Sequence, residues 1–262
     1  MSLLILACAL LTGCASAKRS ISNSAYPPQD SYYCGGVARD GTSDPAFAYQ
    51  GELSEFDVLG IPRNEITSET DIRRALQDSK PIKLRPGSSI LLIQSGALFP
   101  DGPMVDELGK HFRVVPFSGV PTVRKTGAGA MQTESSDPEG YSKSLRLTAA
   151  RGGADFIVCY WGLLESATDK LPTKTVSWVP IVHWLLPDEK HHMRIQIKVA
   201  VVDVRSGNWS IFSTKPLEDA RITTSPHRGV VDQKQVERLK KLAYESSVTE
   251  LVRASSMFES GS

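Results

Sequence analysis

A strand–helix–strand pattern joined by short links is the sequence feature that most constrains the fold. Residues 89–94 form a short, continuously apolar run, which is typical of a strand buried on both faces. Pro103 suits the first position of a helix predicted over residues 104–111, and residues 113–117 follow as a second strand. Because a helix between two neighbouring strands packs on one face of their sheet, the pattern predicts an α/β fold.

The segments that follow extend this pattern into a mixed sheet. They comprise a short helix over residues 142–152, a strand over 155–161, an antiparallel hairpin over 193–213, a polar loop over 216–228 and a long terminal helix capped at Asp232. We therefore predict a single α/β domain over residues 51–262, with helices packed on one mixed sheet. An α+β arrangement of the same elements is the alternative.

The first fourteen residues indicate export and lipidation. The apolar run from Leu3 to Leu11 is much shorter than the roughly 20 residues that span a bilayer, and it is typical of a secretory signal. The Leu-Thr-Gly-Cys sequence that ends at Cys14 resembles the bacterial lipobox, in which the thiol accepts lipid. The sequence thus predicts a signal peptide over residues 1–13 and an acylated Cys14. No Lys or Arg precedes Leu3, so the true start would lie upstream or export would be inefficient.

The residues after Cys14 bear on the location of the protein. Ala15 and Ser16 follow the anchor where an Asp would favour the inner membrane, and by resemblance to known lipoprotein sorting this favours the outer membrane. Residues 15–30 are small, polar and proline-containing, which is typical of a flexible tether. We predict a lipidated tether and an irregular segment over residues 14–50. The protein would face the periplasm, with exposure at the cell surface as the alternative.

Two further cysteines remain once Cys8 has left with the leader and Cys14 carries the lipid. Cys34 and Cys159 would share an oxidising compartment, in which one disulfide between them is an open possibility. The apolar run around Cys159 favours the other interpretation, a small buried hydrophobic side chain. No CxxC pair is present, so the sequence does not support thioredoxin chemistry.

Composition and motifs exclude several functions. The formal net charge is +1, which gives no support for nucleic-acid binding. No GxSxG, HExxH or Walker motif occurs, and no carboxylate is spaced as a partner for a metal site at His183, His191 and His192. We therefore predict no metal site, no cofactor and no catalytic residue.

An apolar, Trp-containing stretch between residues 171 and 188 is open to two interpretations. It forms either a surface for a membrane or partner protein, or a bent segment packed on the core, and its prolines favour the second. The residues that would carry such a surface are Trp178, Ile181, Trp184 and Leu185.

Residues 90–96, 149–158 and 199–207 together resemble a known envelope module. The helix-Gly-Ala-Asp-strand step and the Asp-Val-Arg-Ser-Gly turn are similar to the periplasmic α/β module of rhombotarget-type lipoproteins. They also resemble the TolB N-terminal domain and the curli-secretion lipoprotein. The resemblance covers roughly residues 88–255, judged by element order and short motifs. It implies an assembly, secretion or activator subunit without catalytic residues.

The function expected from the sequence is a non-enzymatic envelope interaction or assembly subunit, held by lipid and bound to an envelope protein or to further copies of itself. In a secretion channel, residues 171–198 would form the membrane-inserting or oligomerising hairpin. One alternative is a small-ligand binding protein with a pocket near residues 94–96 and the 122–141 loop. The other is a hydrolase of envelope material with a dispersed site.

Overall fold

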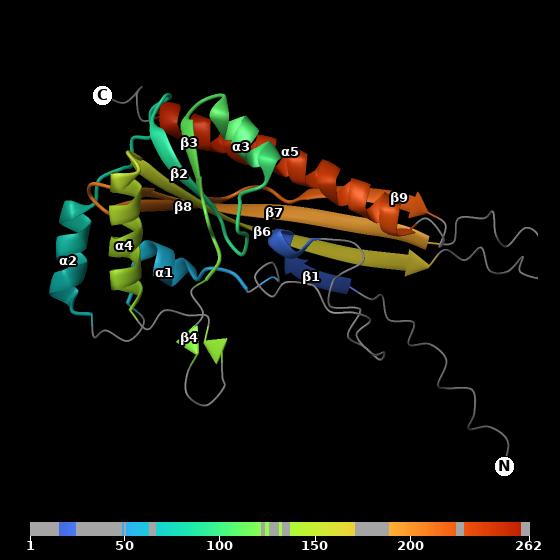
Figure 1. Ribbon diagram of the computed structural model, residues 1–262, viewed down its shortest axis with the longest axis horizontal. Helices are drawn as coiled ribbons and strands as arrows, with labels where there is room; N and C mark the ends of the chain where they lie inside the picture. The colour runs from blue at the N-terminus through green and yellow to red at the C-terminus, as the bar shows by residue number, and fades with distance from the viewer. Residues whose placement is uncertain are drawn as a thin grey trace, which may run out of the picture.

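Two strands of fifteen residues each, β6 (Phe156–Lys170) and β7 (Glu189–Asp203), pair antiparallel along their whole length at the centre of the sheet. Figure 1 shows them in the computed structural model, which describes residues 16–24, 49, 51–62, 67–121, 124–125, 131–132, 137–170, 189–223 and 228–257. The remaining strands of this seven-stranded sheet are β1 (Ser16–Ser20), β2 (Ser89–Gln94), β3 (Arg113–Phe117), β8 (Trp209–Ser213) and β9 (Leu217–Thr223). Parallel and antiparallel pairs both occur, so the predicted mixed sheet of an α/β fold is confirmed.

The sheet has an inner and an outer half, defined by the neighbours of the long pair. In the inner half the strand order is β3-β2-β6-β7-β8. In the outer half β1 pairs with residues 163–167 of β6, and β9 pairs with residues 189–195 of β7. The long pair therefore joins two four- to five-stranded regions into one sheet.

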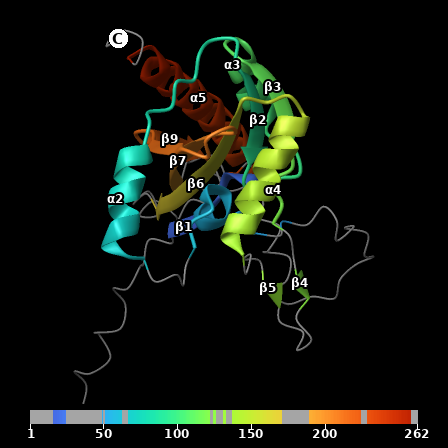
Figure 2. The same cartoon turned by 90° about the vertical axis from the view of Figure 1, so that its left-hand side faces the viewer.

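The inner half is covered on both faces. The helices α5 (Arg228–Met257) and α3 (Gly102–Gly109) lie on one face, and α1 (Glu55–Leu59) and α4 (Pro138–Arg151) lie on the other (Figure 2). Every residue of β2 is buried, as expected for a strand between two layers. Ile90 and Leu92 join the core under α5, whereas Leu91 and Ile93 join the core under α4. The remaining elements are α2 (Glu69–Asp78), which buries no residue, and the short pair β4 (Arg124–Lys125) and β5 (Met131–Gln132).

Residues 16–24 differ from the flexible tether predicted over residues 15–30. They form β1 and the single-turn helix η1 (Ile21–Asn23), and Ile21 is 1% exposed within the core. The main chain of β1 pairs with β6 over five residues, and Gly162 leaves room for the Ile21 side chain. The polar composition that suggests a tether is that of an edge strand, whose structure comes from its partner. Residues 16–24, which precede the domain predicted over residues 51–262, are therefore part of the folded body.

The sequence was also misleading in the C-terminal region. The polar loop predicted over residues 216–228 is wrong because β9 lies there and pairs with β7 in register. The predicted cap at Asp232 is wrong because α5 begins at Arg228, and Asp232 lies buried inside the helix. The hairpin over 193–213 is confirmed as β7 and β8, with β7 beginning four residues earlier.

Enlarging Gly162 should loosen the N-terminal segment. A Cβ atom there would lie 2.3 Å from Ile21 Cδ1, so Gly162→Ala forces Ile21 out of its site. We expect the free energy of unfolding to fall by about 1–3 kcal/mol, measured by urea denaturation. Gly109→Ala is the control because a Cβ at Gly109 meets nothing within 4 Å. Equal stabilities of the two variants would contradict the close packing of Ile21 on Gly162.

Candidate functional site

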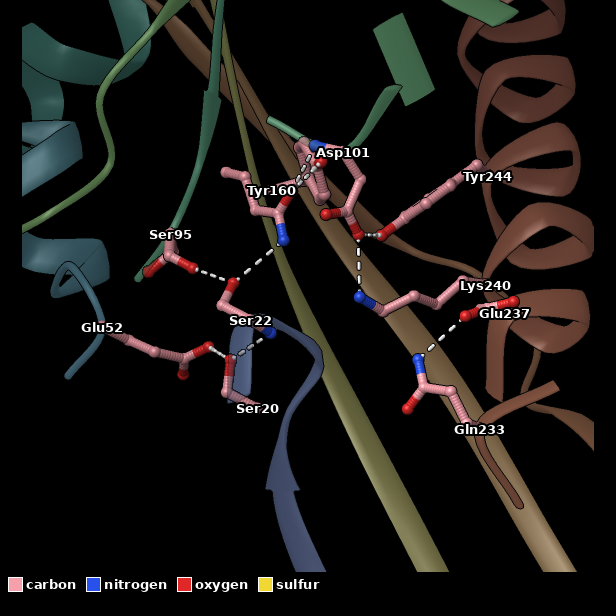
Figure 3. A network of polar contacts seen from close by, with 11 residues as sticks. Ser20, Ser22, Glu52, Ser95, Asp101, Tyr160, Gln233, Glu237, Lys240 and Tyr244 are labelled. Atoms are coloured by element: carbon pink, nitrogen blue, oxygen red, sulfur yellow. Dashed lines mark hydrogen bonds and ion pairs between the residues drawn. The ribbon is translucent and has the colours of Figure 1, made fainter. Parts of the chain in front are cut away.

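The carboxyl end of β2 is where an open α/β sheet ordinarily binds ligands, and a buried Gln lies there. Gln94 is 1% exposed, and both ends of its amide are hydrogen-bonded, to three residues that Figure 3 labels: Ser22, Asp101 and Tyr160. Its Oε1 accepts hydrogen bonds from Tyr160 Oη at 2.6 Å and from the Asp101 backbone N at 2.7 Å. Its Nε2 donates to Ser22 Oγ at 3.0 Å. The Gln94 side chain is thus committed to internal contacts.

The N-terminal part of the chain fills the space at the carboxyl end of β2, which we call the crevice beyond β2. Ser22 Oγ donates to the Ser95 carbonyl at 2.6 Å, and the backbone N of Leu53 donates to Ser95 Oγ at 2.7 Å. A Cβ on Gly96 would lie 2.8 Å from the Tyr49 ring, so the ring lies closer to the backbone at residue 96 than a larger residue there would allow. The described residues therefore occupy the position near residues 94–96 in which a ligand pocket was expected. Most of the 122–136 loop lies outside the described residues.

An ion pair and two phenols continue the network toward α5. Asp101 Oδ2 accepts from Lys240 Nζ at 2.8 Å and from Tyr244 Oη at 2.5 Å. The rings of Tyr160 and Tyr244 meet edge to face at a centroid distance of 5.8 Å. Burial raises the pKa of both phenols well above the ordinary value of 10, so both remain neutral donors. The network links β2, β6, α5 and the start of α3 by side-chain hydrogen bonds, which indicates a structural role.

A second polar contact holds the end of β1. Ser20 Oγ donates to Glu52 Oε1 at 2.7 Å. Burial raises the pKa of the Glu52 carboxyl, while the Ser20 hydrogen bond and the Lys198 charge act in the opposite direction. β1 is therefore held to the rest of the protein by a side-chain hydrogen bond as well as by its backbone pairing with β6.

The outer half carries a cavity of about 520 Å³ among charged side chains. Glu165 pairs with Lys18 at 2.8 Å and also with Arg194, which lies 3.7 Å from Glu218. Hydrogen bonds from Lys18 and Arg194 lower the pKa of Glu165. The charges compensate one another across β1, β6, β7 and β9, which gives this end of the sheet a polar surface without a large net charge.

Three exposed apolar side chains lie on two adjoining segments, and we call them together the apolar loop patch: Leu98, Phe99 and Phe117. Their segments lie side by side, because Gly96 N donates to the Gly119 carbonyl and Gly119 N donates to the Ala97 carbonyl. Phe99 is 73% exposed. Sequence reasoning missed this patch, although an apolar pair directly before Pro100 in a turn is a usable signal.

Most residues singled out from the sequence lie outside the described residues. These are Cys14, Cys34, Trp178, Ile181, Trp184 and Leu185. Cys159 is fully buried and packs as a small apolar side chain, and burial raises the pKa of its thiol. The disulfide with Cys34 stays untested. Residues 189–198 of the suggested hairpin belong to β7. Within the described ranges no group of three or more potential metal ligands occurs.

Comparison with known families places the chain. The family described as YafT bacterial lipoprotein matches residues 54–254. The chain belongs to this family. No curated protein matches it. The family is one of bacterial lipoproteins, so the protein is held to an envelope membrane by lipid, and no helix in the described ranges is long and apolar enough to span a bilayer. The likeness to the TolB and curli-secretion modules stays a prediction.

Replacing Gln94 tests whether the network is structural. Gln94→Met leaves the Asp101 N–H and the Tyr160 hydroxyl without their acceptor. We expect a loss of about 2–4 kcal/mol in the free energy of unfolding, against about 0.5–1.5 kcal/mol for Tyr160→Phe, which removes one donor only. Urea denaturation measures both. A Gln94→Met protein as stable as Tyr160→Phe would mean that the network contributes little.

Glu52 should make stability depend on pH. Its pKa is raised in the folded state, so stability falls as pH rises through its ordinary value of 4.5 and levels off above the raised value. Glu52→Gln removes this loss, so its stability relative to the unmodified protein should increase between about pH 4 and pH 7. Urea denaturation across this range, with Glu69→Gln on exposed α2 as control, measures the difference. Parallel pH profiles for Glu52→Gln and the unmodified protein would refute the assignment.

Proposed function

We propose that this member of the YafT lipoprotein family is a non-enzymatic interaction subunit of the outer membrane. It is anchored through acylated Cys14, faces the periplasm and binds another envelope protein. The observation that carries the proposal is the contrast between two neighbouring features. The crevice beyond β2 is filled by the chain itself, whereas the apolar loop patch beside it is open to solvent.

The filled crevice supports binding of a protein over binding of a small molecule there. A ligand at the end of β2 would have to displace Ser22 and Tyr49 and would leave the buried Gln94 Nε2 without the Ser22 hydroxyl that accepts its hydrogen bond. Leaving a buried polar group unpaired costs about 1–3 kcal/mol. The polar side chains at this position thus favour the closed arrangement.

The apolar loop patch supports contact with a partner. Phe99 and Phe117 project from adjoining segments, and aromatic side chains are enriched at the centres of protein interfaces. Burying one such side chain in a partner contributes about 1.5–3 kcal/mol. The patch borders β3, which has a strand neighbour on one side only in the described part of the sheet.

Crosslinking in intact cells tests the proposal. Cells carrying the tagged lipoprotein are crosslinked, the membranes are solubilised, and co-purifying proteins are identified. We expect one abundant envelope protein with the acylated chain and none with Cys14→Ser, which is not anchored. Recovery of the same protein from the unanchored Cys14→Ser chain would contradict a role for the lipid.

Exposed apolar residues offer a matched pair of variants. Phe99→Ser should reduce the crosslinked yield about tenfold, as expected for the loss of one interface side chain worth about 1.4 kcal/mol. Leu242→Ser on α5 is the control because Leu242 is also exposed, at 42%, and lies outside the patch. Equal yields from the two variants would remove the patch from the proposal and leave only the anchor.

A further inference from the structure

The distance between the lipid and the folded sheet is set by the covalent chain. Ser16 is the first residue of β1, and only Ala15 lies between it and Cys14. Two residues of fully extended chain span about 7 Å at most. If Cys14 carries the lipid, as proposed above, the sheet begins within that distance of the acylated residue.

The segment that begins there is bound firmly to the body. All five residues of β1 pair with β6, from Ser16 opposite Ala167 to Ser20 opposite Leu163. Ile21 is buried in the core, and Ser22 is part of the Gln94 network. Releasing β1 to serve as a tether would expose Ile21 and open that network together.

The register places the anchor at one end of the molecule. Ser16 lies opposite Ala167, which pairs with His192, which in turn pairs with Ala220. This row lies three residues from the end of β6, or about 10 Å. From Ala167 back to the start of β6 is eleven residues, about 36 Å along the strand. The lipid is therefore attached at the outer end of the sheet.

We propose that the outer end rests directly on the surface of the bilayer that holds the lipid, and that the inner half projects away from it. The outer surface of α5 supports this upright orientation. Between residues 232 and 254, where its side chains are described, the exposed residues include Glu237, Lys241 and Arg253, so this part of the helix offers no continuous apolar face on which the protein would lie flat. The compensated charges of Lys18, Glu165 and Arg194 then lie at the height of the lipid headgroups.

The upright orientation sets the distance between the apolar loop patch and the bilayer. The apolar loop patch lies near the level of Tyr160, which is seven residues, or about 23 Å, from Ala167 along β6. A partner that contacts the patch is therefore bound close to the same bilayer. A flexible tether would not impose this limit.

Energy transfer to a bilayer dye tests the orientation in the acylated full-length protein. The protein is placed in vesicles of phosphatidylethanolamine and phosphatidylglycerol with a headgroup acceptor dye. A donor is attached at Ala220→Cys in the outer half or at Arg151→Cys at the inner end, both exposed positions, with Cys34 replaced by Ser. We expect several-fold higher transfer from position 220. Equal transfer from the two positions would overturn the upright orientation.

A linker insertion supplies the matched control. About fifteen Gly and Ser residues between Ala15 and Ser16 add a root-mean-square span of about 20 Å. Transfer from position 220 should then fall toward that from position 151. An unchanged signal would overturn the direct contact. Mass spectrometry separates the two proposals: an unlipidated Cys14 refutes the anchor, whereas a lipidated Cys14 with equal transfer refutes only the orientation.

Discussion

The pairing of β1 with the outer half of β6 is the interaction on which the rest of the structure depends. β6 has fifteen residues, but β2 pairs with only the first five of them. Without β1, residues 163–167 would present an open row of backbone donors and acceptors, which is a template for unwanted strand addition. β9 protects the corresponding part of β7 in the same way. Two polar strands thus protect the edges of the outer part of the central pair, and α5 packs over this region as well.

Residues 16–24, which contain β1 and η1, also explain why the crevice beyond β2 is closed. β1 delivers η1 to the end of β2, where Ile21 packs against the bare backbone of Gly162 and Ser22 satisfies the Gln94 amide. Gln94 then holds Tyr160 and the start of α3, and Asp101 holds α5 through Lys240 and Tyr244. Edge protection, closure of the crevice and the proposed position of the anchor therefore have one cause. A chain that began after residue 24 would lose all three together.

Strands and helices could be predicted from the sequence where the residues that determine them are close together in the chain. The buried strand at 89–94, the helix after Pro103 and the hairpin near residue 203 were found because apolar periodicity and turn residues are local features. β1 and β9 were missed because their residues are polar, and their strand conformation comes from a partner far away in the sequence. The position of the site at Gln94 followed from strand order. Its closure did not, because Ser22 lies 72 residues from Gln94.

The direction of β1 also decides how the anchor bears load. Ser16, the first residue of β1, lies toward the outer end of β6, so with Cys14 acylated as proposed, a pull on the lipid would act along the strand. Hydrogen bonds of an antiparallel ladder run perpendicular to the strands, and such a pull therefore loads them in shear. All five residue pairs, together with buried Ile21, resist it at once instead of opening one after another. Pulling β1 out of the sheet would therefore also require removal of Ile21 from the core.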